Sequence, residues 1–406
     1  MLLIAAPGQG AQVPGFLLEW LALPGMSERL GSWSEQAGCD LIRYGTTADA
    51  DEIRDTAIAQ PLLVASASAA AAELLGEPGR PAALADAAVD AGVGATAGHS
   101  VGELAAGAIA GVIPPQDAMR LVGVRGRAMA RAAAAEPTGM TAVLGGDEEA
   151  VLASIEAHGL TPANVNGGGQ IVAAGTMDQL AAFAADPPPG ARLRPLPVAG
   201  AFHTRHMAPA VDALREAAAG VRPGHPAVAL LSNRDGSVVR GGDDWLERIV
   251  IQVSAPVRWD KCMRAMAGLG VSALIELPPA GTLTGLARRG LPGVRTLALK
   301  TPADLDQARE LLEPAHHPDG GGHAPDWRLL VAPLAGTFRA GPLDGAPSGP
   351  GTTVGVGADL GHLEIRGGNH TISPPFPATI IEWLVEDGDP VNVGQPLVRL
   401  QPNGTD

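Results

Sequence analysis

Lysine is nearly absent from the chain, which has only Lys261 and Lys300 among its 406 residues. Arginine supplies nearly all of the positive charge, and acidic side chains outnumber basic ones, so the formal net charge is −15. Proteins that bind duplex nucleic acid neutralise its phosphates with clusters of lysine and arginine. The acidic balance therefore argues against a nucleic-acid partner.

Cysteines and long apolar runs are also scarce. Cys39 and Cys262 lack the spacing of a metal site and are too few for a disulfide framework, which fits a reducing cytoplasm. The opening MLLIAAPGQGAQVPG has an apolar run of only about six residues and no basic lead, unlike a signal peptide. No run approaches the roughly twenty apolar residues that span a bilayer. We expect a soluble, cytoplasmic protein with no membrane partner.

The composition that remains fits a globular α/β enzyme. Aromatic residues are only 3% of the chain, but 46% is hydrophobic and 17% is charged, as in folded proteins with aliphatic cores. Predicted strands and helices alternate through the first three quarters, with strong helical segments at 58–76 and 115–135. Within these three quarters, residues 129–197 follow the order β-α-β-β-α-β, which is typical of a ferredoxin-like subdomain. We expect this subdomain to be inserted in a larger α/β subdomain made of 1–128 and 198–301.

The last quarter differs in character. A tract rich in Pro, Gly and His at 313–327 has no carboxylate or cysteine placed to complete a metal shell, which favours a linker over a metal site. We assign 302–326 to a helix followed by this linker. Beyond it, 354–363 and 391–400 share the pattern Val-x-Val-Gly-x-x-Leu-x-x-Leu. The repeat predicts a small all-β sandwich or barrel with internal two-fold symmetry.

The segment ATAGHSVGELAAG places Ser100 between Gly98 and Gly102, where a predicted strand meets a predicted helix. A tight turn there exposes the serine oxygen, and the first N–H groups of the helix can stabilise an oxyanion. Taken alone, the pattern also fits a structural turn. Two other segments favour a nucleophile. The glycine-rich GQGAQ after the first strand can supply a second N–H, and His203 follows a predicted strand in AGAFHTRHM.

Arg125 lies on the apolar side of the helix predicted at 115–135. Three other arginines of this helix, Arg120, Arg127 and Arg131, fall within about 40° of one another around its axis. Arg125 is rotated about 140° from Arg120, among apolar side chains. A buried guanidinium is costly without a partner. The partner is either a protein carboxylate or an anionic group of a bound ligand.

Together these segments resemble the malonyl-CoA:acyl carrier protein transacylase family, whose marks are GQGxQ, GHSxGE, an arginine on the next helix and a late AFH. The resemblance covers roughly residues 1–301. It implies an acyltransferase with an α/β-hydrolase-like core, in which Ser100 is the nucleophile and His203 is the general base of a Ser-His dyad. It also implies that the acyl group passes through a seryl acyl-enzyme by a ping-pong route.

Further positions follow from the same resemblance. The backbone N–H groups of Gln9 and Val101 match the oxyanion hole, and the backbone carbonyl of Gln252 matches the group that orients the histidine in place of a carboxylate. Asn166 matches an asparagine near the acyl pocket, with a plain turn residue as the equal alternative. His99 is assigned to the substrate-binding surroundings as a packing residue, because adjacent side chains on such a turn diverge.

The resemblance also implies the substrates. Arg125 matches the arginine that grips the free carboxylate of a malonyl-type acyl group. Phe202 matches an aromatic that accompanies malonyl rather than branched acyl groups, with core packing as the alternative. The implied reaction carries malonyl from coenzyme A to the phosphopantetheine thiol of an acyl carrier protein, in fatty acid or polyketide synthesis, with no bound cofactor or metal. The exposed arginines are candidates to receive an acidic carrier, although a solvated face explains them nearly as well.

Residues 327–403 resemble the biotinyl/lipoyl domain, through VAPLAGTF and IIEWLVEDGDPVNVGQPLVRL. Such carriers hold their cofactor on a lysine at a hairpin tip, within Glu-Ala-Met-Lys. When the segments on either side of the hairpin are aligned with those of such carriers, EIRG at 364–367 falls on this tetrapeptide, so Gly367 occupies the lysine position. No lysine follows Lys300, which excludes attached biotin or lipoate, since a protonated arginine is not nucleophilic.

The role of this last segment stays open at the level of sequence. It is a candidate to dock a carrier, to cover the acyl site, to hold a further protein or a second copy, or to serve only as a folding unit. His370 and Trp383 are candidates to line a pocket, although tryptophan in a strand is more often part of the core.

Three rival functions remain open at this point. An esterase or thioesterase would share the serine turn but would need a carboxylate behind the histidine and would not need Arg125. An interaction protein would have a vestigial catalytic half. An acyl-loading component of a malonate decarboxylase would differ only in its partner.

Overall fold

The computed structural model describes residues 1–76, 84–312, 328–341, 349–365, 368–374, 376–385, 387–391 and 393–403. The chain divides into two compact units, Met1–Ala315 and His316–Asp406. The His-rich tract and Gly367, to which the sequence assigns a linker and a lost attachment site, lie outside the described residues.

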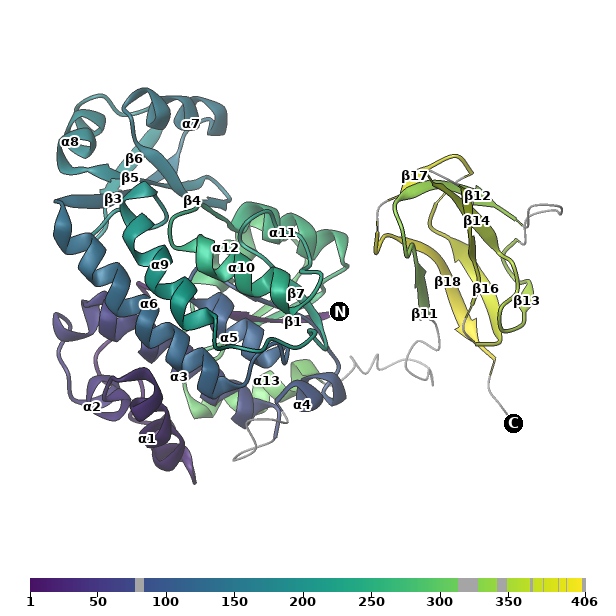
Figure 1. Cartoon of the computed structure of the whole chain (residues 1–406), viewed down its shortest axis with the longest axis horizontal. Coiled ribbons are helices and arrows are strands. Elements are labelled where there is room, and N and C mark those ends of the chain that lie inside the picture. Colours follow the sequence, from purple (N-terminus) through teal and green to yellow (C-terminus); the bar gives the residue numbers. More distant parts are fainter. Residues whose placement is uncertain are drawn as a thin grey trace. The chain divides into compact units, whose positions relative to one another are not determined.

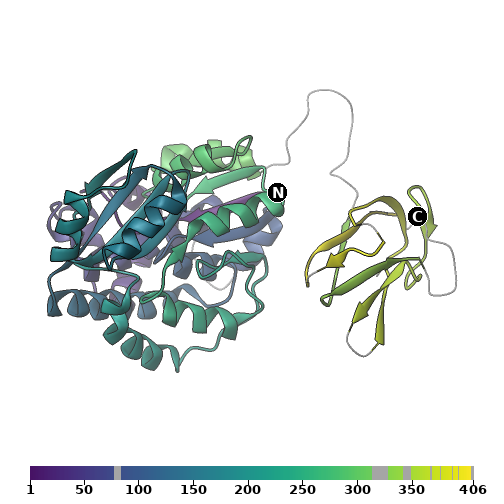
Figure 2. The ribbon, with the colours of Figure 1, turned by 90° about the horizontal axis from the view of Figure 1, so that it is seen from above.

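A five-stranded parallel sheet forms the centre of the first unit, in the order β10-β9-β1-β2-β7. Its strands are β1 (Leu2–Ala6), β2 (Val93–Gly98), β7 (Ala229–Leu231), β9 (Ala273–Glu276) and β10 (Arg295–Ala298). Helices lie on both faces of this sheet (Figures 1 and 2). All of β1 is buried, and its alternate residues enter two different apolar clusters, one on each face. A strand covered on both faces needs a continuous apolar run, as LLIAA provides.

Besides two helices on a second sheet, described below, the described helices of this unit are α1 (Met26–Ala37), α2 (Leu41–Thr46), α3 (Thr56–Leu74), α4 (Leu84–Asp90), α5 (Gly102–Ile109), α6 (Pro115–Ala135), α9 (Ala208–Ala218), α10 (Gly242–Gln252), α11 (Trp259–Gly268), α12 (Thr282–Gly290) and α13 (Leu305–Leu312). Short 3₁₀ turns occur at η1 (Trp20–Ala22), η2 (Glu52–Arg54), η4 (Arg205–Met207) and η5 (Pro302–Asp304). The predicted helix at 115–135 is confirmed with these bounds as α6, and the one at 58–76 is confirmed as α3.

Within the described residues, α3 is the one helix long and apolar enough to cross a membrane by length and composition. However, 78% of its best window is buried inside the protein. It packs against α5 and α6, so its Ala- and Leu-rich surface forms the core of the unit.

A second sheet in the same unit has the order β6-β3-β5-β4-β8. Its strands are β3 (Thr138–Gly145), β4 (Thr161–Gly167), β5 (Gln170–Thr176), β6 (Ala191–Pro195) and β8 (Val257–Arg258). The first four pair antiparallel, and β8 joins β4 in parallel. The helices α7 (Glu148–Ala157) and α8 (Met177–Ala185) cover one face of this small sheet (Figure 1).

The described part of the second unit contains two antiparallel four-stranded sheets, β11-β18-β16-β13 and β15-β14-β12-β17. The strands are β11 (Arg328–Val331), β12 (Gly336–Ala340), β13 (Thr353–Val354), β14 (Gly361–Ile365), β15 (Gly368–Ile372), β16 (Ala378–Trp383), β17 (Pro390–Val391) and β18 (Pro396–Pro402). The two copies of the sequence repeat form β13 with β14 and β17 with β18. Exchanging β13 with β17, β14 with β18, β12 with β16 and β15 with β11 converts one strand order into the other. The sequence repeat is thus matched by a repeat in the pairing of the strands.

Candidate active site

Ser100 lies in the turn between β2 and α5 with a φ of 53°, in the left-handed region that side chains rarely adopt. Both flanking glycines are required by close contacts. A Cβ at Gly98 would lie 2.0 Å from the carbonyl carbon of Gly102, and one at Gly102 would lie 2.2 Å from the carbonyl oxygen of Ala6. The Gly-x-Ser-x-Gly pattern therefore encodes a tight, strained turn that presents the serine oxygen.

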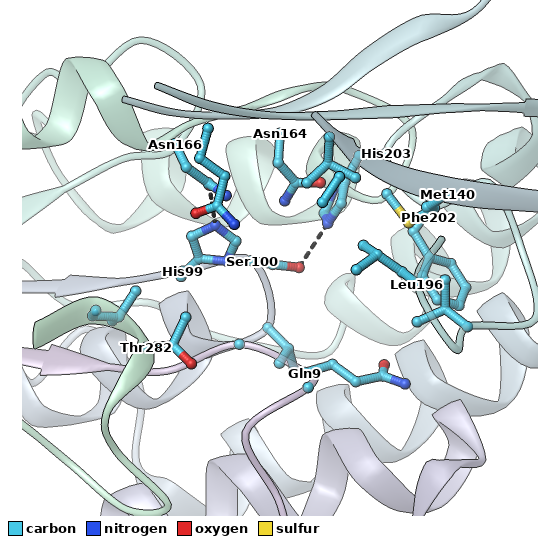
Figure 3. Close-up of a pocket in the computed structure, with 18 of the residues that line it drawn as sticks. Gln9, His99, Ser100, Met140, Asn164, Asn166, Leu196, Phe202, His203 and Thr282 are labelled. Carbon is cyan, nitrogen blue, oxygen red and sulfur yellow. Dashed lines mark hydrogen bonds between the residues drawn. The ribbon is translucent and has the colours of Figure 1, made fainter. Parts of the chain in front are cut away.

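His203 faces this serine from a loop more than a hundred residues further along the chain. Its Nε2 lies 2.7 Å from Ser100 Oγ (Figure 3). Its Nδ1 lies 2.9 Å from the backbone carbonyl oxygen of Gln252. A carbonyl only accepts, so Nδ1 carries the hydrogen and Nε2 presents its lone pair to the serine hydroxyl. This is the arrangement of a base and a nucleophile.

The histidine is held in its neutral form. Burial, together with the positive charge of Arg125, lowers the pKa of His203 to about 3. A neutral imidazole is able to accept the serine proton at neutral pH.

Gln9 and Val101 lie on the pocket side of this dyad. Both line the pocket that contains Ser100. Among the residues that the structure describes, neither backbone N–H has a hydrogen-bond acceptor. Val101 directly precedes α5, where free N–H groups and the helix dipole favour negative charge. Two unused donors beside a nucleophile are what an oxyanion hole needs.

Arg125 is 1% exposed and reaches the same serine from α6. Its Nη2 donates to Ser100 Oγ at 3.3 Å and to Gln252 Oε1 at 2.9 Å, and its Nη1 donates to Gln60 Oε1 at 2.7 Å. No ion pair within 4.0 Å joins it to a carboxylate of the described residues, so that alternative finds no support. Burial lowers the pKa of Arg125 to about 10, against the opposing charge of Glu103.

Three residues of this site were missed by sequence reasoning. Asn233, after β7, accepts from the Ser100 N–H and donates to the Gly98 carbonyl, both at 2.7 Å. Gln60 holds Arg125, and Glu103 is buried under the serine turn. Each is a polar residue next to an apolar run, in LLSN, IAQPLL and GELAAG, and that is the signal that could have found them.

The pocket around Ser100 has a volume of about 220 Å³. Of the residues above, Gln9, Gln60, Ser100, Val101 and His203 line it. The rest of its wall includes Gly8, Gly10, Met129, Met140, Ala142, Asn164, Gln170, Val172, Leu196, Val198, Thr282, Leu283 and Leu286. Phe202 also lines it and is 6% exposed (Figure 3). The mostly apolar wall and the polar groups near the nucleophile suit a small acyl group.

His99 and Asn166 meet on the other side of the serine. His99 Nε2 lies 2.9 Å from Asn166 Oδ1 (Figure 3). The imidazole also packs edge-on against Trp259. Both His99 and Asn166 line the pocket. Burial lowers the pKa of His99, and its hydrogen bond to Asn166 opposes this shift. The side chain is therefore neutral and packs at the pocket wall, away from the serine oxygen.

In the second unit, His370 is exposed, and Trp383 packs against Phe338 with ring centroids 5.2 Å apart. The two lie in different sheets, β15 and β16. Across the described parts of both units, no group of three or more His, Cys, Asp or Glu side chains is placed to hold a metal ion.

Comparison with known proteins gives matches over the first unit. The family model described as "Acyl transferase domain" matches residues 7–325, so it ends before β11 begins. The malonyl CoA-acyl carrier protein transacylase of Mycobacterium tuberculosis is 50% identical over 311 residues, which are 77% of this chain and 100% of that protein. The protein of the same name from Escherichia coli K12 is 35% identical, over 75% of this chain and 97% of its own.

Solved structures agree with these matches. The crystal structure of MCAT from Mycobacterium tuberculosis superposes with a TM-score of 0.71 at 50% identity, covering 76% of this chain and 99% of its own. A malonyl-transacylase in complex with its type II PKS acyl-carrier protein gives a TM-score of 0.67 at 28% identity, covering 76% of this chain and 99% of its own.

Proposed function

The chain belongs to the malonyl CoA-acyl carrier protein transacylase family, and from this premise we propose that it transfers its acyl group through an ester on Ser100. The enzyme moves a malonyl group from coenzyme A to an acyl carrier protein. One observation carries the proposed route. Ser100 Oγ lies 2.7 Å from the neutral base His203 and 3.3 Å from the buried guanidinium of Arg125.

In the first half-reaction His203 Nε2 takes the proton of Ser100 as Oγ bonds to the thioester carbonyl carbon. The carbonyl oxygen gains the negative charge, and the N–H groups of Gln9 and Val101 are its proposed donors. Collapse breaks the carbon–sulfur bond, and His203 returns the proton to the leaving thiol of coenzyme A. In the second half-reaction the carrier thiol gives its proton to His203 as its sulfur bonds to the ester carbonyl carbon. Collapse breaks the bond from that carbon to Ser100 Oγ, and His203 returns the proton to Oγ.

Arg125 is the proposed clamp for the malonyl carboxylate. A guanidinium has five N–H donors, and the described contacts use only part of them. Gln60 and Gln252 hold it with amide oxygens, and no carboxylate of the described residues forms an ion pair with it. A carboxylate entering the pocket supplies a counter-ion in bidentate geometry. Acetyl lacks this group, so the clamp selects a dicarboxylic acyl chain, and Phe202 limits its width.

The proposed phosphate contacts are Arg192 and Arg194 on the edge strand β6. Arg194 is paired with Ala142 across the sheet, and Arg192 with Leu144. Directly paired residues share a face, and Ala142 lines the pocket. The two arginines are exposed and have no ion pair within the described residues. They extend the pocket face with free positive charge, suited to the phosphates of coenzyme A and of the carrier's prosthetic group.

The contacts of His203 argue against the esterase or thioesterase alternative. An esterase of this type would hold the imidazole with a carboxylate, whereas Nδ1 here faces a backbone carbonyl.

We also propose a domain organisation. A large subdomain spans 1–128 and 198–301, and 129–197 form a ferredoxin-like subdomain whose strand order β6-β3-β5-β4 supports it. Residues 302–326 link this acyltransferase to a biotinyl/lipoyl-like module at 327–403, supported by its two-fold strand order. The module carries no cofactor, because no lysine follows Lys300. Its proposed role is to contact a further protein.

The experiment that tests the proposed route is intact mass after mixing with malonyl-CoA or acetyl-CoA. The unaltered enzyme gains one malonyl group, Ser100→Ala gains none, and Ser27→Ala on the exposed side of α1 behaves as the unaltered enzyme. An adduct that persists without Ser100, or no adduct from either thioester, contradicts the proposal.

A further inference from the structure

Glu103 is a buried carboxylate that the acyl-transfer steps do not use. It lies in the first turn of α5, three residues after the nucleophile, and is 1% exposed. It forms no ion pair within 4.0 Å with the described residues. Removing a carboxylate from water without a partner is costly, so its contacts must account for its place.

Its two oxygens accept hydrogen bonds from residues that hold the dyad and the clamp. One accepts from the backbone N–H of Asn233 at 2.8 Å, and the other accepts from the side-chain Nε2 of Gln252. An ionised carboxylate only accepts. In its ionised form Glu103 therefore orients the Gln252 amide with its NH₂ toward the carboxylate and its oxygen the other way.

The oxygen of that amide faces Arg125. Gln252 Oε1 accepts from Arg125 Nη2 at 2.9 Å, while Gln252 Nε2 also donates to the Ser100 carbonyl oxygen at 3.1 Å. Reversing the amide would set its NH₂ against the guanidinium, donor against donor. The same residue's backbone carbonyl orients His203. The orientation of one amide thus decides whether the arginine keeps its place.

We propose that Glu103 is a positioning residue that holds Arg125 in its malonyl-binding pose through the amide of Gln252, and so sets the preference for a dicarboxylic acyl group. The inference rests on the proposed function, since it assumes that Arg125 receives the malonyl carboxylate.

The charge on Glu103 has a second effect on this pose. Burial raises the pKa of Glu103 to about 8, while its bonds from Asn233 and Gln252 and the charges of Arg125 and Arg248 lower it. The other titratable group that it influences here is Cys262, whose thiol pKa is raised mainly by burial. Protonation removes the acceptor-only character that fixes the Gln252 amide. The preference for malonyl over acetyl therefore rises as Glu103 ionises.

The test compares single-turnover acylation by malonyl-CoA and acetyl-CoA in the full chain at about pH 9, where Glu103 is mostly ionised. Glu103→Gln lowers the ratio of the malonyl rate to the acetyl rate at least about tenfold, the equivalent of one lost bond to a charged group. Glu103→Asp keeps the charge and retains part of the ratio. Glu73→Gln removes the partner of Arg29 at a distant helix end and leaves the ratio unchanged.

An unchanged ratio in Glu103→Gln overturns the inference, whether both rates stay or both fall together, because a merely structural role moves both alike. If Glu103→Gln does not fold, the unaltered enzyme decides the matter, since its ratio must rise through a titration near pH 8. A flat ratio is the contrary result. Ser100 esterification by malonyl-CoA in the unaltered enzyme is scored separately, so failure of this inference is distinct from failure of the proposed function.

Discussion

Ser100 Oγ and His203 Nε2 lie 2.7 Å apart, and both residues hold left-handed backbone torsions, with φ of 53° and 62°. Each such torsion costs on the order of 1–3 kcal/mol in a residue other than glycine. Each is held by bonds that the turn alone does not supply. Asn233 anchors the serine turn, and the His203 N–H donates to the Val253 carbonyl at 3.1 Å. The short contact is thus prepared before substrate enters.

Arg125 is expected to control which acyl group is accepted. Arg125→Ala lowers kcat/KM for malonyl-CoA by about 10²-fold or more, because a bidentate bond to a carboxylate is lost. Acylation by acetyl-CoA falls far less. Arg125→Lys, which keeps the charge but not the fork, should lie between the two. Equal losses for both thioesters would show that the arginine only supports the fold.

The low pKa of His203 predicts a flat pH profile for acylation. With that pKa at about 3, the base is neutral throughout the range from about pH 5 to 8. Single-turnover acylation by acetyl-CoA, which does not engage Arg125, should show no inflection there. An inflection near the pKa of free histidine would contradict the assignment.

The pH dependence of the free energy of unfolding gives a second test of the low pKa of His203. The pKa of His203 is lower in the folded chain than in the unfolded chain. At a pH between these two values the unfolded chain binds a proton at this histidine and the folded chain does not. The stability that neutral His203 contributes at a pH above its pKa in the unfolded chain is therefore lost as the pH falls toward its pKa in the folded chain. Between pH 6.5 and 5 the unaltered enzyme should lose roughly 2 kcal/mol more unfolding free energy than His203→Gln. Urea unfolding at the two pH values measures this difference.

Asn233 is expected to be as important to the turn as the glycines are. Asn233→Ala leaves the Ser100 N–H and the Gly98 carbonyl without their partner, at a cost of about 2–4 kcal/mol. Acylation should slow as well, because the serine loses its fixed position. Urea unfolding and single-turnover rates test both effects, and Asn369→Ala on the exposed strand β15 is the control. Full activity at unchanged stability would be the contrary result.

The two exposed arginines of β6, Arg192 and Arg194, are expected to bind phosphate rather than the acyl group. Replacing both by alanine raises KM for malonyl-CoA by about tenfold at low salt, and the effect shrinks as salt rises. The rate of acylation at saturation stays the same. Arg222→Ala, an exposed arginine outside the strand β6, is the control. A fall in the saturated rate would place these arginines nearer the chemistry.

The sequence predicted those features that depend on interactions between residues close together in the chain. The bounds of α6, the burial of Arg125 and the need for Gly98 and Gly102 follow from helical periodicity and turn sterics, which act over a few residues. Ser100 and His203, the proposed nucleophile and base, were selected from short sequence motifs that can be recognised without knowing the fold.

The hydrogen-bond network under the serine was not predicted. Asn233 is 133 residues from Ser100, and Gln252 is 149 residues from Glu103. They meet because β2 and β7 are neighbours in a parallel sheet and because α10 ends beside the turn. No local pattern states which strands are neighbours, and β8 joining the small sheet was likewise not foreseen.

The last prediction concerns the second unit. Among the described residues, its apolar clusters contain only residues of the second unit, and the pocket around Ser100 is lined only by residues of the first unit. A chain that ends at Ala315 should therefore fold and be acylated by malonyl-CoA at a rate within about threefold of the full chain. The malonyl-to-acetyl ratio should also be unchanged. Loss of acylation would mean that the first unit needs the second. Loss confined to transfer onto the carrier protein would instead assign the second unit to docking that carrier, because only the second half-reaction involves it.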